Sequence, residues 1–396
     1  MISGKKQIQM EHLKDKTNMK NILITGGAGF IGGSLSIALV KKGYLVTIID
    51  NMSPQIHGDD YKQSVLFQKI QGIVEFVKGD VLDKILMAKL VQSHDAIIHL
   101  AAETGTGQSM YQIHKYTDVN VNGSALLLDI IANGGDNRIK KLIIASSRAI
   151  YGEGAYLCSQ HGRVHPNSRK ESDLSNGDFN TKCPKCNANL NLCSTEENDK
   201  VDASSIYGLT KYMQEQMFLI TGKALKIPTI ALRYQNVYGP GQSLKNPYTG
   251  ILSIFSTRIK NGNEINIFED GKESRDFVYI DDVVQATILA LESEHIDSDV
   301  FNVGSGIATS VQTVAETLLR KYNSKNKWSV SGAFRVGDIR HNYADLFKIK
   351  SALGYSPKYT FEKGISNFVD WVNQQEVQED NYEKSIVEMR KKGFFK

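Results

Sequence analysis

A tyrosine and a lysine lie four residues apart at Tyr207 and Lys211, within the sequence Tyr-Gly-Leu-Thr-Lys. On a helix, this spacing places the phenol and the ammonium group on the same face, one turn apart. A free tyrosine, with a pKa of about 10, is a poor base at neutral pH, but a nearby cation favours the phenolate, which can accept a proton from a hydroxyl group. The spacing alone carries little weight, because the chain contains 17 tyrosines. It gains weight from Ser146 and Ser147, which end a predicted strand ahead of that helix.

A glycine pattern near the start of the chain predicts a dinucleotide site. Gly26, Gly29 and Gly32 directly follow the apolar run 21–25. Glycines at this spacing let a strand turn tightly into a helix, whose N-terminal backbone N–H groups can then bind a pyrophosphate. The next apolar run, 44–49, ends in Asp50, whose carboxylate can accept the hydroxyls of an adenosine ribose and would repel a 2′-phosphate. Together these features predict NAD rather than NADP.

The elements that position these groups follow from apolar runs that alternate with helical patterns. Continuous apolar runs suit strands that are buried on both faces of a parallel sheet. Strands are expected at 21–25, 44–49, 73–78, 95–101, 140–146 and 228–233, and helices at 30–42, 117–134 and 203–225. The alternation predicts an α/β fold of the Rossmann type, a doubly wound parallel sheet with ligands outside the carboxyl ends of its strands. Shorter elements beyond residue 240, with helices near 309–322, 345–353 and 361–374, predict a smaller C-terminal substrate-binding lobe.

The length of 396 residues allows a large core and more than one lobe. We expect a disordered leader at 1–18, a dinucleotide-binding domain at 19–240, a substrate lobe at 241–375 and a helical extension at 376–396 without a readable function. The net charge of +4 does not favour a nucleic-acid or membrane partner, and no apolar run approaches the length of a membrane span. The polar, lysine-rich start has no signal-peptide pattern, so a cytoplasmic protein is expected.

The segment 153–202 interrupts the pattern as a polar insertion that contains all four cysteines of the chain. Two close pairs of ligands, C-x2-H and C-x2-C, predict a closed, structural zinc site, and metal binding would supply folding energy to a segment with few large apolar residues. The candidate ligands are Cys158, His161, Cys183 and Cys186. His165 and Cys193 are spare candidates, and free surface cysteines remain the alternative. The expected role of the insertion is a lid over the substrate pocket.

In their order along the chain, these motifs resemble the extended short-chain dehydrogenase/reductases that act on nucleotide sugars. The resemblance runs from about residue 19 to 375 and implies a homodimer, formed through the helices at 117–134 and 203–222. It is carried by 25–32, Asp50, 79–80, 99–102, 120–122, Ser147 with 151–152, Tyr207 with Lys211, 233–241, 275–282 and 335–338.

The resemblance also implies roles for individual residues. In the implied triad, Tyr207 is the acid and base, Lys211 holds the nicotinamide ribose and lowers the tyrosine pKa, and Ser147 hydrogen-bonds the reacting hydroxyl. The implied cofactor-binding residues are Gly26, Gly29, Phe30, Ile31, Gly32, Asp50, Asn51, Asp80, Val81, Leu100, Ala101, Ala102, Thr104, Asn120, Tyr207 and Lys211. The implied substrate-binding residues are Ser147, Arg148, Asn236, Arg275, Arg335 and Asp338, in which arginine forks suit a diphosphate.

The residues after Ser147 discriminate between the reactions of this family. The 4,6-dehydratases carry Asp-Glu at the positions of Arg148 and Ala149, and decarboxylases tend to carry Glu at the second position. A guanidinium that stays protonated and a methyl group cannot perform that proton transfer. Epimerisation at C3 and C5 would need a cysteine or similar residue in the pocket, and all the cysteines lie in the insertion. The remaining reaction is an NAD-dependent 4-epimerisation through a 4-keto intermediate.

The segments 102–111 and 146–155, together with the insertion, resemble most the dTDP-L-rhamnose 4-epimerases. The substrate implied is a dTDP- or UDP-linked sugar, with dTDP-L-rhamnose and dTDP-6-deoxy-L-talose as the first choice. The alternatives are a UDP-hexose 4-epimerase and an NAD-dependent nucleotide-sugar dehydrogenase or 4-ketoreductase. An NAD-sensing regulator without enzymatic activity is disfavoured, because the chain keeps both Tyr207 and Lys211.

Overall fold

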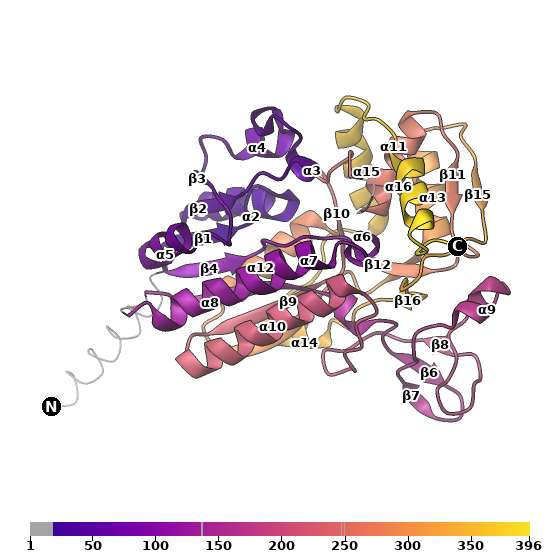
Figure 1. Cartoon of the computed structure of the whole chain (residues 1–396), viewed down its shortest axis with the longest axis horizontal. Coiled ribbons are helices and arrows are strands. Elements are labelled where there is room, and N and C mark those ends of the chain that lie inside the picture. The colour runs from indigo at the N-terminus through magenta and orange to yellow at the C-terminus, as the bar shows by residue number, and fades with distance from the viewer. Residues whose placement is uncertain (1–18, 136–137, 247, 249) are drawn as a thin grey trace.

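A seven-stranded sheet forms the centre of the molecule, in the order β13-β9-β5-β4-β1-β2-β3 (Figure 1). Every neighbouring pair in it is parallel. Its strands are β1 (Asn21–Thr25), β2 (Leu45–Asp50), β3 (Glu75–Lys78), β4 (Ala96–His99), β5 (Lys141–Ser147), β9 (Thr229–Tyr234) and β13 (Ser298–Val303). The computed structural model describes residues 19–135, 138–246, 248 and 250–396, so the leader predicted at 1–18 lies outside the described residues.

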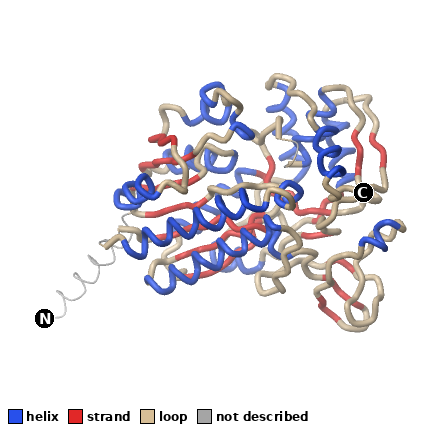
Figure 2. Tube along the Cα trace, in the orientation of Figure 1, coloured by secondary structure: helices blue, strands red, loops and turns tan. Residues whose placement is uncertain are grey.

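Helices cover both faces of this sheet, which confirms the predicted doubly wound Rossmann-type fold (Figure 2). On one face α2 (Phe30–Lys41) packs against α12 (Ile280–Glu292), and on the other α8 (Gly123–Asn133) packs against both α5 (Lys84–Ser93) and α10 (Ile206–Leu225). Alternate residues of β1 supply the two cores, because successive side chains of a strand point to opposite faces. Ile22 and Ile24 belong to one apolar cluster, and Leu23 belongs to the other.

The smaller lobe contains short strands and the last helices of the chain. Its strands are β10 (Asn236–Tyr238), β12 (Ser274–Tyr279), β14 (Ala308–Ser310) and β16 (His341–Asn342), with β11 (Ile265–Ile267) paired to β15 (Trp328–Val330). Its helices are α11 (Ile251–Lys260), α13 (Val311–Lys321), α15 (Phe361–Asn373) and α16 (Tyr382–Lys391). One further helix late in the chain, α14 (Phe347–Leu353), packs against β13 of the central sheet.

A division of the chain at residue 240 proves too simple, because α12 and β13 return to the Rossmann sheet after that point. β13 is the edge strand beside β9, and its first half is exposed or only partly buried. It therefore lacks the continuous apolar run by which the other strands are recognised.

Shorter segments connect these elements. They are α3 (Pro54–His57), η1 (Tyr61–Gln63), α4 (Val65–Ile70), α6 (Thr106–Ser109), α7 (Ile113–Tyr116), η2 (Thr117–Asn122), η3 (Arg148–Tyr151) and α9 (Glu171–Ser175). The insertion holds a small antiparallel sheet of β6 (Tyr156–Cys158), β7 (Gly162–Val164) and β8 (Asn191–Leu192). The helix predicted at 117–134 begins as the π-helical segment η2 and continues as α8. Among the described helices, none is long and apolar enough to cross a membrane.

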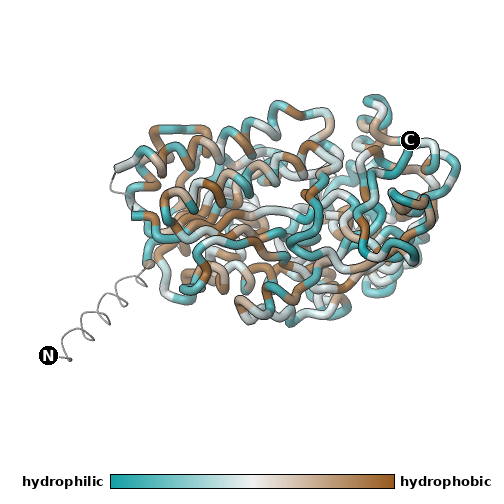
Figure 3. The backbone as a smooth tube through the Cα atoms, turned by 90° about the horizontal axis from the view of Figure 1, so that it is seen from below, coloured by the Kyte–Doolittle hydropathy of each residue, from teal (hydrophilic) through white to brown (hydrophobic). Residues whose placement is uncertain are grey.

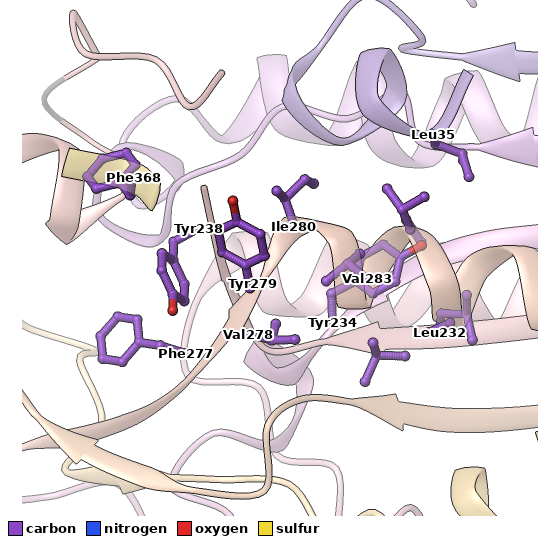
Figure 4. Close-up of a cluster of buried hydrophobic side chains, with 14 of the residues drawn as sticks. Leu35, Leu232, Tyr234, Tyr238, Phe277, Val278, Tyr279, Ile280, Val283 and Phe368 are labelled. Atoms are coloured by element: carbon purple, nitrogen blue, oxygen red, sulfur yellow. The ribbon is translucent and has the colours of Figure 1, made fainter. Parts of the chain in front are cut away.

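One apolar cluster joins the two lobes. It runs from Leu35 and Leu232 of the Rossmann domain to Tyr238, Phe277 and Phe368 of the smaller lobe (Figure 4). Figure 3 shows hydrophobic stretches gathered in the interior of the larger lobe. This shared core fixes the orientation of the lobes and therefore the shape of the cavity between them.

Candidate active site

A cavity of about 540 Å³ lies at the carboxyl ends of the Rossmann strands. Its lining includes residues that follow or end six of these strands, and residues of the smaller lobe complete it. In open α/β sheets this edge is where ligands bind. The position therefore agrees with the site expected from the sequence.

The glycine-rich turn leaves no room for side chains. Gly26 has a φ of +67°, and a Cβ there would lie 2.7 Å from the backbone nitrogen of Ala101. A Cβ at Gly32 would lie 2.6 Å from the Cα of Gly27. Gly29 is the N-cap of α2, so the free N–H groups of the first turn lie beside the cavity. This cradle fits the pyrophosphate of a dinucleotide.

Asp50 ends β2 at the wall of the cavity. Its Oδ2 accepts a hydrogen bond of 3.1 Å from the N–H of Ala28, and its Oδ1 accepts one of 2.9 Å from the N–H of Met52. Burial raises the pKa of this carboxyl group, while the two backbone hydrogen bonds and His57 oppose the rise. Each oxygen can accept a further hydrogen bond, as a ribose diol requires.

All the predicted cofactor-binding residues line the cavity except Asn120. Asn120 is fully buried, and its Oδ1 accepts a hydrogen bond of 2.8 Å from the N–H of Glu103. Its Nδ2 donates to the Glu103 carbonyl and to Oγ1 of Thr210, at 3.1 and 2.9 Å. Asn120 thus holds the loop after β4 against α10 from behind the cavity, in a supporting position.

The predicted triad converges on the cavity. Ser205 caps α10 by accepting from the N–H of Gly208, and Oγ of Ser109 accepts a 3.0 Å hydrogen bond from the N–H of Tyr207. Burial raises the pKa of Tyr207, whereas a hydrogen bond from Ser147 and the positive charge of Arg148 lower it. The serine and arginine therefore both favour the phenolate that a general base requires.

Lys211 is buried, and burial lowers its pKa to about 7, although the charge of Glu215 opposes the shift. Its Nζ donates a hydrogen bond of 2.8 Å to Oε1 of Gln214, whose Nε2 donates to Oγ of Ser124 at 2.8 Å. Ser124 in turn contacts Nε2 of the buried His99 at 3.1 Å. This chain of hydrogen bonds positions the ammonium group, and the sequence motifs do not reveal it.

The predicted substrate-binding residues also line the cavity. Asp338 accepts hydrogen bonds from Arg335 and Arg275, at 2.8 and 3.1 Å, and Nε of Arg148 donates to Oδ1 of Asn236 at 2.8 Å. Burial alone would raise the pKa of Asp338, but the surrounding arginines hold it well below its usual range. Burial and the charge of Arg275 lower the pKa of Arg148 to about 10. The guanidinium groups of four arginines thus lower the pKa of one carboxylate: Arg148, Arg169, Arg275 and Arg335.

Arg275 differs from Arg148 and Arg335. Its terminal nitrogens donate to Asp338 and to the carbonyl oxygens of Ser274, Ile339 and Arg340. Of the five N–H groups of a guanidinium, only the one at Nε is then available. The terminal nitrogens of Arg148 make no hydrogen bond to the described residues. We therefore expect Arg148 and Arg335 to provide most of the contacts to a diphosphate.

Three features of the cavity were missed at the level of sequence. The side-chain nitrogen and oxygen of Gln235 are both buried without a partner among the described residues. Burial raises the pKa of Glu273 to about 7. The C-terminal helix α16 contributes Tyr382, Ser385, Ile386 and Met389 to the wall. The only sequence signal for the helix was the helical spacing of these residues.

The insertion does not cover the cavity, because none of the described residues from 150 to 206 lines it. The prediction of a lid is therefore wrong. Instead, Arg169 of the insertion donates to Glu153, to Glu269 and to the carbonyl oxygen of Asp338, at 3.0, 2.8 and 3.0 Å. This almost fully buried arginine holds the segment 335–340 from behind.

The four predicted zinc ligands come together in the insertion, with their ligand atoms within 4.8 Å of one another. Cys158 Sγ lies 3.5 Å from His161 Nδ1 and 3.7 Å from Cys186 Sγ, and Cys183 Sγ lies 3.7 Å from His161 Nδ1. Neither spare candidate belongs to this group. His165 instead pairs with Asp199, and Cys193 faces Arg163.

Two family models match the chain. The model described as GDP-mannose 4,6 dehydratase matches residues 23–169, and the model described as NAD dependent epimerase/dehydratase family matches residues 186–304. A dTDP-L-rhamnose 4-epimerase from Burkholderia thailandensis is 38% identical over 358 residues, which cover 90% of this chain and 96% of the relative. The chain belongs to the NAD dependent epimerase/dehydratase family.

Other members of the family match over similar lengths. A UDP-N-acetyl-alpha-D-glucosaminuronate decarboxylase from Bacillus cytotoxicus is 29% identical, covering 90% of this chain and 99% of the relative. The structure of UDP-glucuronic acid 4-epimerase from Bacillus cereus, in complex with UDP-glucuronic acid and NAD, matches with a TM-score of 0.73 at 25% identity, covering 89% and 99% of the two chains. The UDP-glucose 4-epimerase of Thermotoga maritima, solved with UDP-glucose, matches with a TM-score of 0.71 at 30% identity and the same coverage. These comparisons confirm the predicted family and the predicted class, the NAD-dependent nucleotide-sugar epimerases.

Proposed function

We propose that this member of the family is a 4-epimerase that interconverts dTDP-L-rhamnose and dTDP-6-deoxy-L-talose. The observation that carries the proposal is that Ser147, Tyr207 and Lys211 share one cavity with three arginines. The choice of sugar is supported by the 38% identity, over nearly the whole of both chains, to a dTDP-L-rhamnose 4-epimerase. A UDP-hexose is the alternative substrate, supported by the structural match to UDP-sugar 4-epimerases.

The residues suggest how the reaction proceeds. Tyr207 as phenolate takes the proton from the C4 hydroxyl, while Ser147 holds the oxygen of that hydroxyl in place. Bound NAD would supply the acceptor, and later the donor, of the C4 hydride. The 4-keto sugar turns over while Arg148 and Arg335 keep hold of the diphosphate, and Tyr207 then returns the proton. The hydrogen bond from Ser147 and the charge of Arg148 stabilise the phenolate.

The wall beside Ser147 also argues against dehydration and decarboxylation. The two residues that follow it into the cavity are Arg148 and Ala149. A 4,6-elimination needs an acid and base pair there, and neither side chain can transfer a proton at neutral pH. The site can therefore oxidise the sugar at C4 but has no second acid or base at this position to eliminate water. This combination supports 4-epimerisation.

The proposal predicts turnover without added cofactor. Purified protein incubated with dTDP-L-rhamnose should produce dTDP-6-deoxy-L-talose, followed through the sugar H4 signal by NMR, because the hydride is returned within each cycle. Activity on a UDP-hexose but not on dTDP-L-rhamnose would keep the mechanism and discard the substrate. Turnover that begins only when NAD or NADH is added would instead indicate a dehydrogenase or 4-ketoreductase.

We also propose a structural zinc ion bound by Cys158, His161, Cys183 and Cys186. Zn–S and Zn–N bonds of ordinary length place tetrahedral ligands about 3.8 Å apart for two sulfurs and about 3.6 Å apart for sulfur and nitrogen. The measured separations of 3.7, 3.5 and 3.7 Å support this geometry. Four protein ligands leave no open position, so the role is structural.

Metal analysis of the purified protein is expected to give one zinc per chain, and Cys183→Ser should lose it. Loss of the ion should loosen the insertion around its ligands, seen as faster proteolysis there, because the ion joins 158–161 to 183–186. Cys193→Ser is the matched control and should keep the ion, since Cys193 lies outside the cluster. Equal zinc loss in both variants, or metal-free wild-type protein, would contradict the proposal.

We further propose a homodimer through α8 and α10. Leu209, Met213 and Ile220 of α10 are 46%, 40% and 66% exposed, and their spacing places them on one face of the helix. An exposed apolar stripe of this kind supports burial against a second copy. Sedimentation equilibrium of the wild-type protein tests this proposal.

A further inference from the structure

The C-terminal helix α16 presents one face to the substrate cavity. Tyr382, Ser385, Ile386 and Met389 all line it, and their spacing of three, one and three residues places them on one side of a helix. These four residues are 2–6% exposed, whereas Val387 on the other side is 46% exposed. Figure 1 shows α16 within the smaller lobe, close to the C-terminus of the chain.

The residues after α16 are paired with the segment that carries Arg335. The N–H of Phe334 donates to the carbonyl of Lys396 at 2.8 Å, and the N–H of Lys396 donates back at 3.0 Å. The N–H of Val336 donates to the carbonyl of Phe394 at 3.0 Å. The end of the chain thus forms an extra strand-like edge that fixes the backbone on both sides of Arg335.

The other contacts of the extension reach the Rossmann domain. A Cβ at Gly107, which lines the cavity, would lie 3.2 Å from Sδ of Met389. The rings of Tyr111 and Phe394 stack at a centroid distance of 6.2 Å. The extension therefore bridges the two lobes at the side of the cavity.

The arginines indicate which part of the ligand meets α16. Arg148 lies beside Tyr207, where its charge lowers the tyrosine pKa. Arg335 donates to Asp338 at 2.8 Å, and its guanidinium lies 5.4 Å from the centroid of the Phe268 ring. Phe268 in turn packs against Tyr382 at 6.3 Å. Neighbouring interactions thus lead from Tyr207 through Arg148, Asp338 and Arg335 to these aromatic rings.

Two buried polar atoms in this part of the lining have no hydrogen-bond partner among the described residues. They are the hydroxyl of Tyr382, a residue only 6% exposed, and Oδ1 of Asn266. A buried polar group without a partner is costly unless a ligand or water satisfies it. An aromatic and apolar wall with a donor and an acceptor suits a flat ring with a polar edge, as in a nucleotide base.

We infer that the C-terminal extension 376–396 is one wall of the nucleotide subsite, in which Tyr382 hydrogen-bonds the edge of a pyrimidine base. The inference rests on the proposed function for the chemistry of the ligand, a pyrimidine nucleoside diphosphate. It adds that the base is recognised by a helix at the end of the chain, and that the same segment fixes Arg335 for the diphosphate.

Binding of dTDP, measured by calorimetry on the NAD-containing protein, tests the inference without any turnover. Tyr382→Phe removes only the hydroxyl and should weaken dTDP binding about five-fold, the effect of one lost hydrogen bond. A chain that ends at Gln375 should bind dTDP more than about ten-fold more weakly, because the wall and the support of Arg335 are both lost. The NAD content should stay unchanged in both. Val387→Ala is the matched control on the exposed face and should bind dTDP like the wild type.

Unchanged dTDP binding by Tyr382→Phe, or by a shortened chain that retains NAD, would overturn the inference, and so would wild-type protein that binds neither dTDP nor UDP. If the shortened chain does not fold, Tyr382→Phe decides. Weaker dTDP binding by Tyr382→Phe, in a protein that does not epimerise dTDP-L-rhamnose, would support the subsite while rejecting the proposed reaction.

Discussion

Tyr207→Phe is expected to lower the kcat of epimerisation by about 10³-fold or more, with little change in bound NAD or in the KM for the sugar nucleotide. The change removes only the hydroxyl that exchanges a proton with the C4 oxygen. The ring should still pack edge to face against Tyr116, at a centroid distance of 6.5 Å. The loss should therefore appear in the chemical step, which single-turnover formation of NADH absorbance would report.

Tyr212→Phe is the matched control, because Tyr212 lies on the same helix and does not line the cavity. This variant should keep wild-type kcat. A Tyr207→Phe enzyme with more than about a tenth of wild-type kcat would show that another group accepts the proton, and Glu273, whose pKa burial raises to about 7, would be the first to examine. A large rise in KM with unchanged kcat would assign Tyr207 to binding instead.

The sequence was informative wherever chemistry and backbone conformation depend on neighbouring residues. The turn at Gly26, the acid at Asp50 and the pair Tyr207 and Lys211 each lie within a short motif, and the structure brings all of them to one cavity. Continuous apolar runs also located the inner strands, since strands covered on both faces need such runs.

What the sequence did not reveal depends on residues far apart in the chain. β13 is an edge strand whose residues pair with residues of β9 that lie 69 positions earlier, and its exposed first half hides the apolar pattern. α16 has polar residues over most of its surface, and its contacts with Phe268 and Gly107, both far away in the chain, make it part of the site. The role of Asn120 also changes with context, because its side chain is used by the Glu103 backbone and Thr210.

A buried ion pair behind the catalytic residues shows the same dependence on distant residues and carries the second large prediction. Glu215 of α10 is fully buried, and its two oxygens accept hydrogen bonds of 2.9 and 2.6 Å from Arg233 of β9. Oε2 also accepts a 2.6 Å hydrogen bond from Ser146, the neighbour of Ser147. The pair thereby ties the helix of Tyr207 to the strands beneath it.

Arg233→Met is expected to lower the free energy of unfolding by about 3–5 kcal/mol, because the variant leaves the carboxylate of Glu215 buried without its cation. Urea denaturation of the NAD-containing protein measures the loss, and Arg320→Met is the matched control. The ion pair of Arg320 with Glu362 is exposed on both sides, so this control should change stability by at most about 1 kcal/mol. The double variant Glu215→Leu with Arg233→Met should recover part of the loss, since no unpaired charge then remains in the core. The double variant could instead lose as much stability as Glu215→Leu and Arg233→Met lose when their separate losses are added. That outcome would show that the two side chains stabilise the protein through packing and not through charge, and that the surrounding apolar side chains position the catalytic helix.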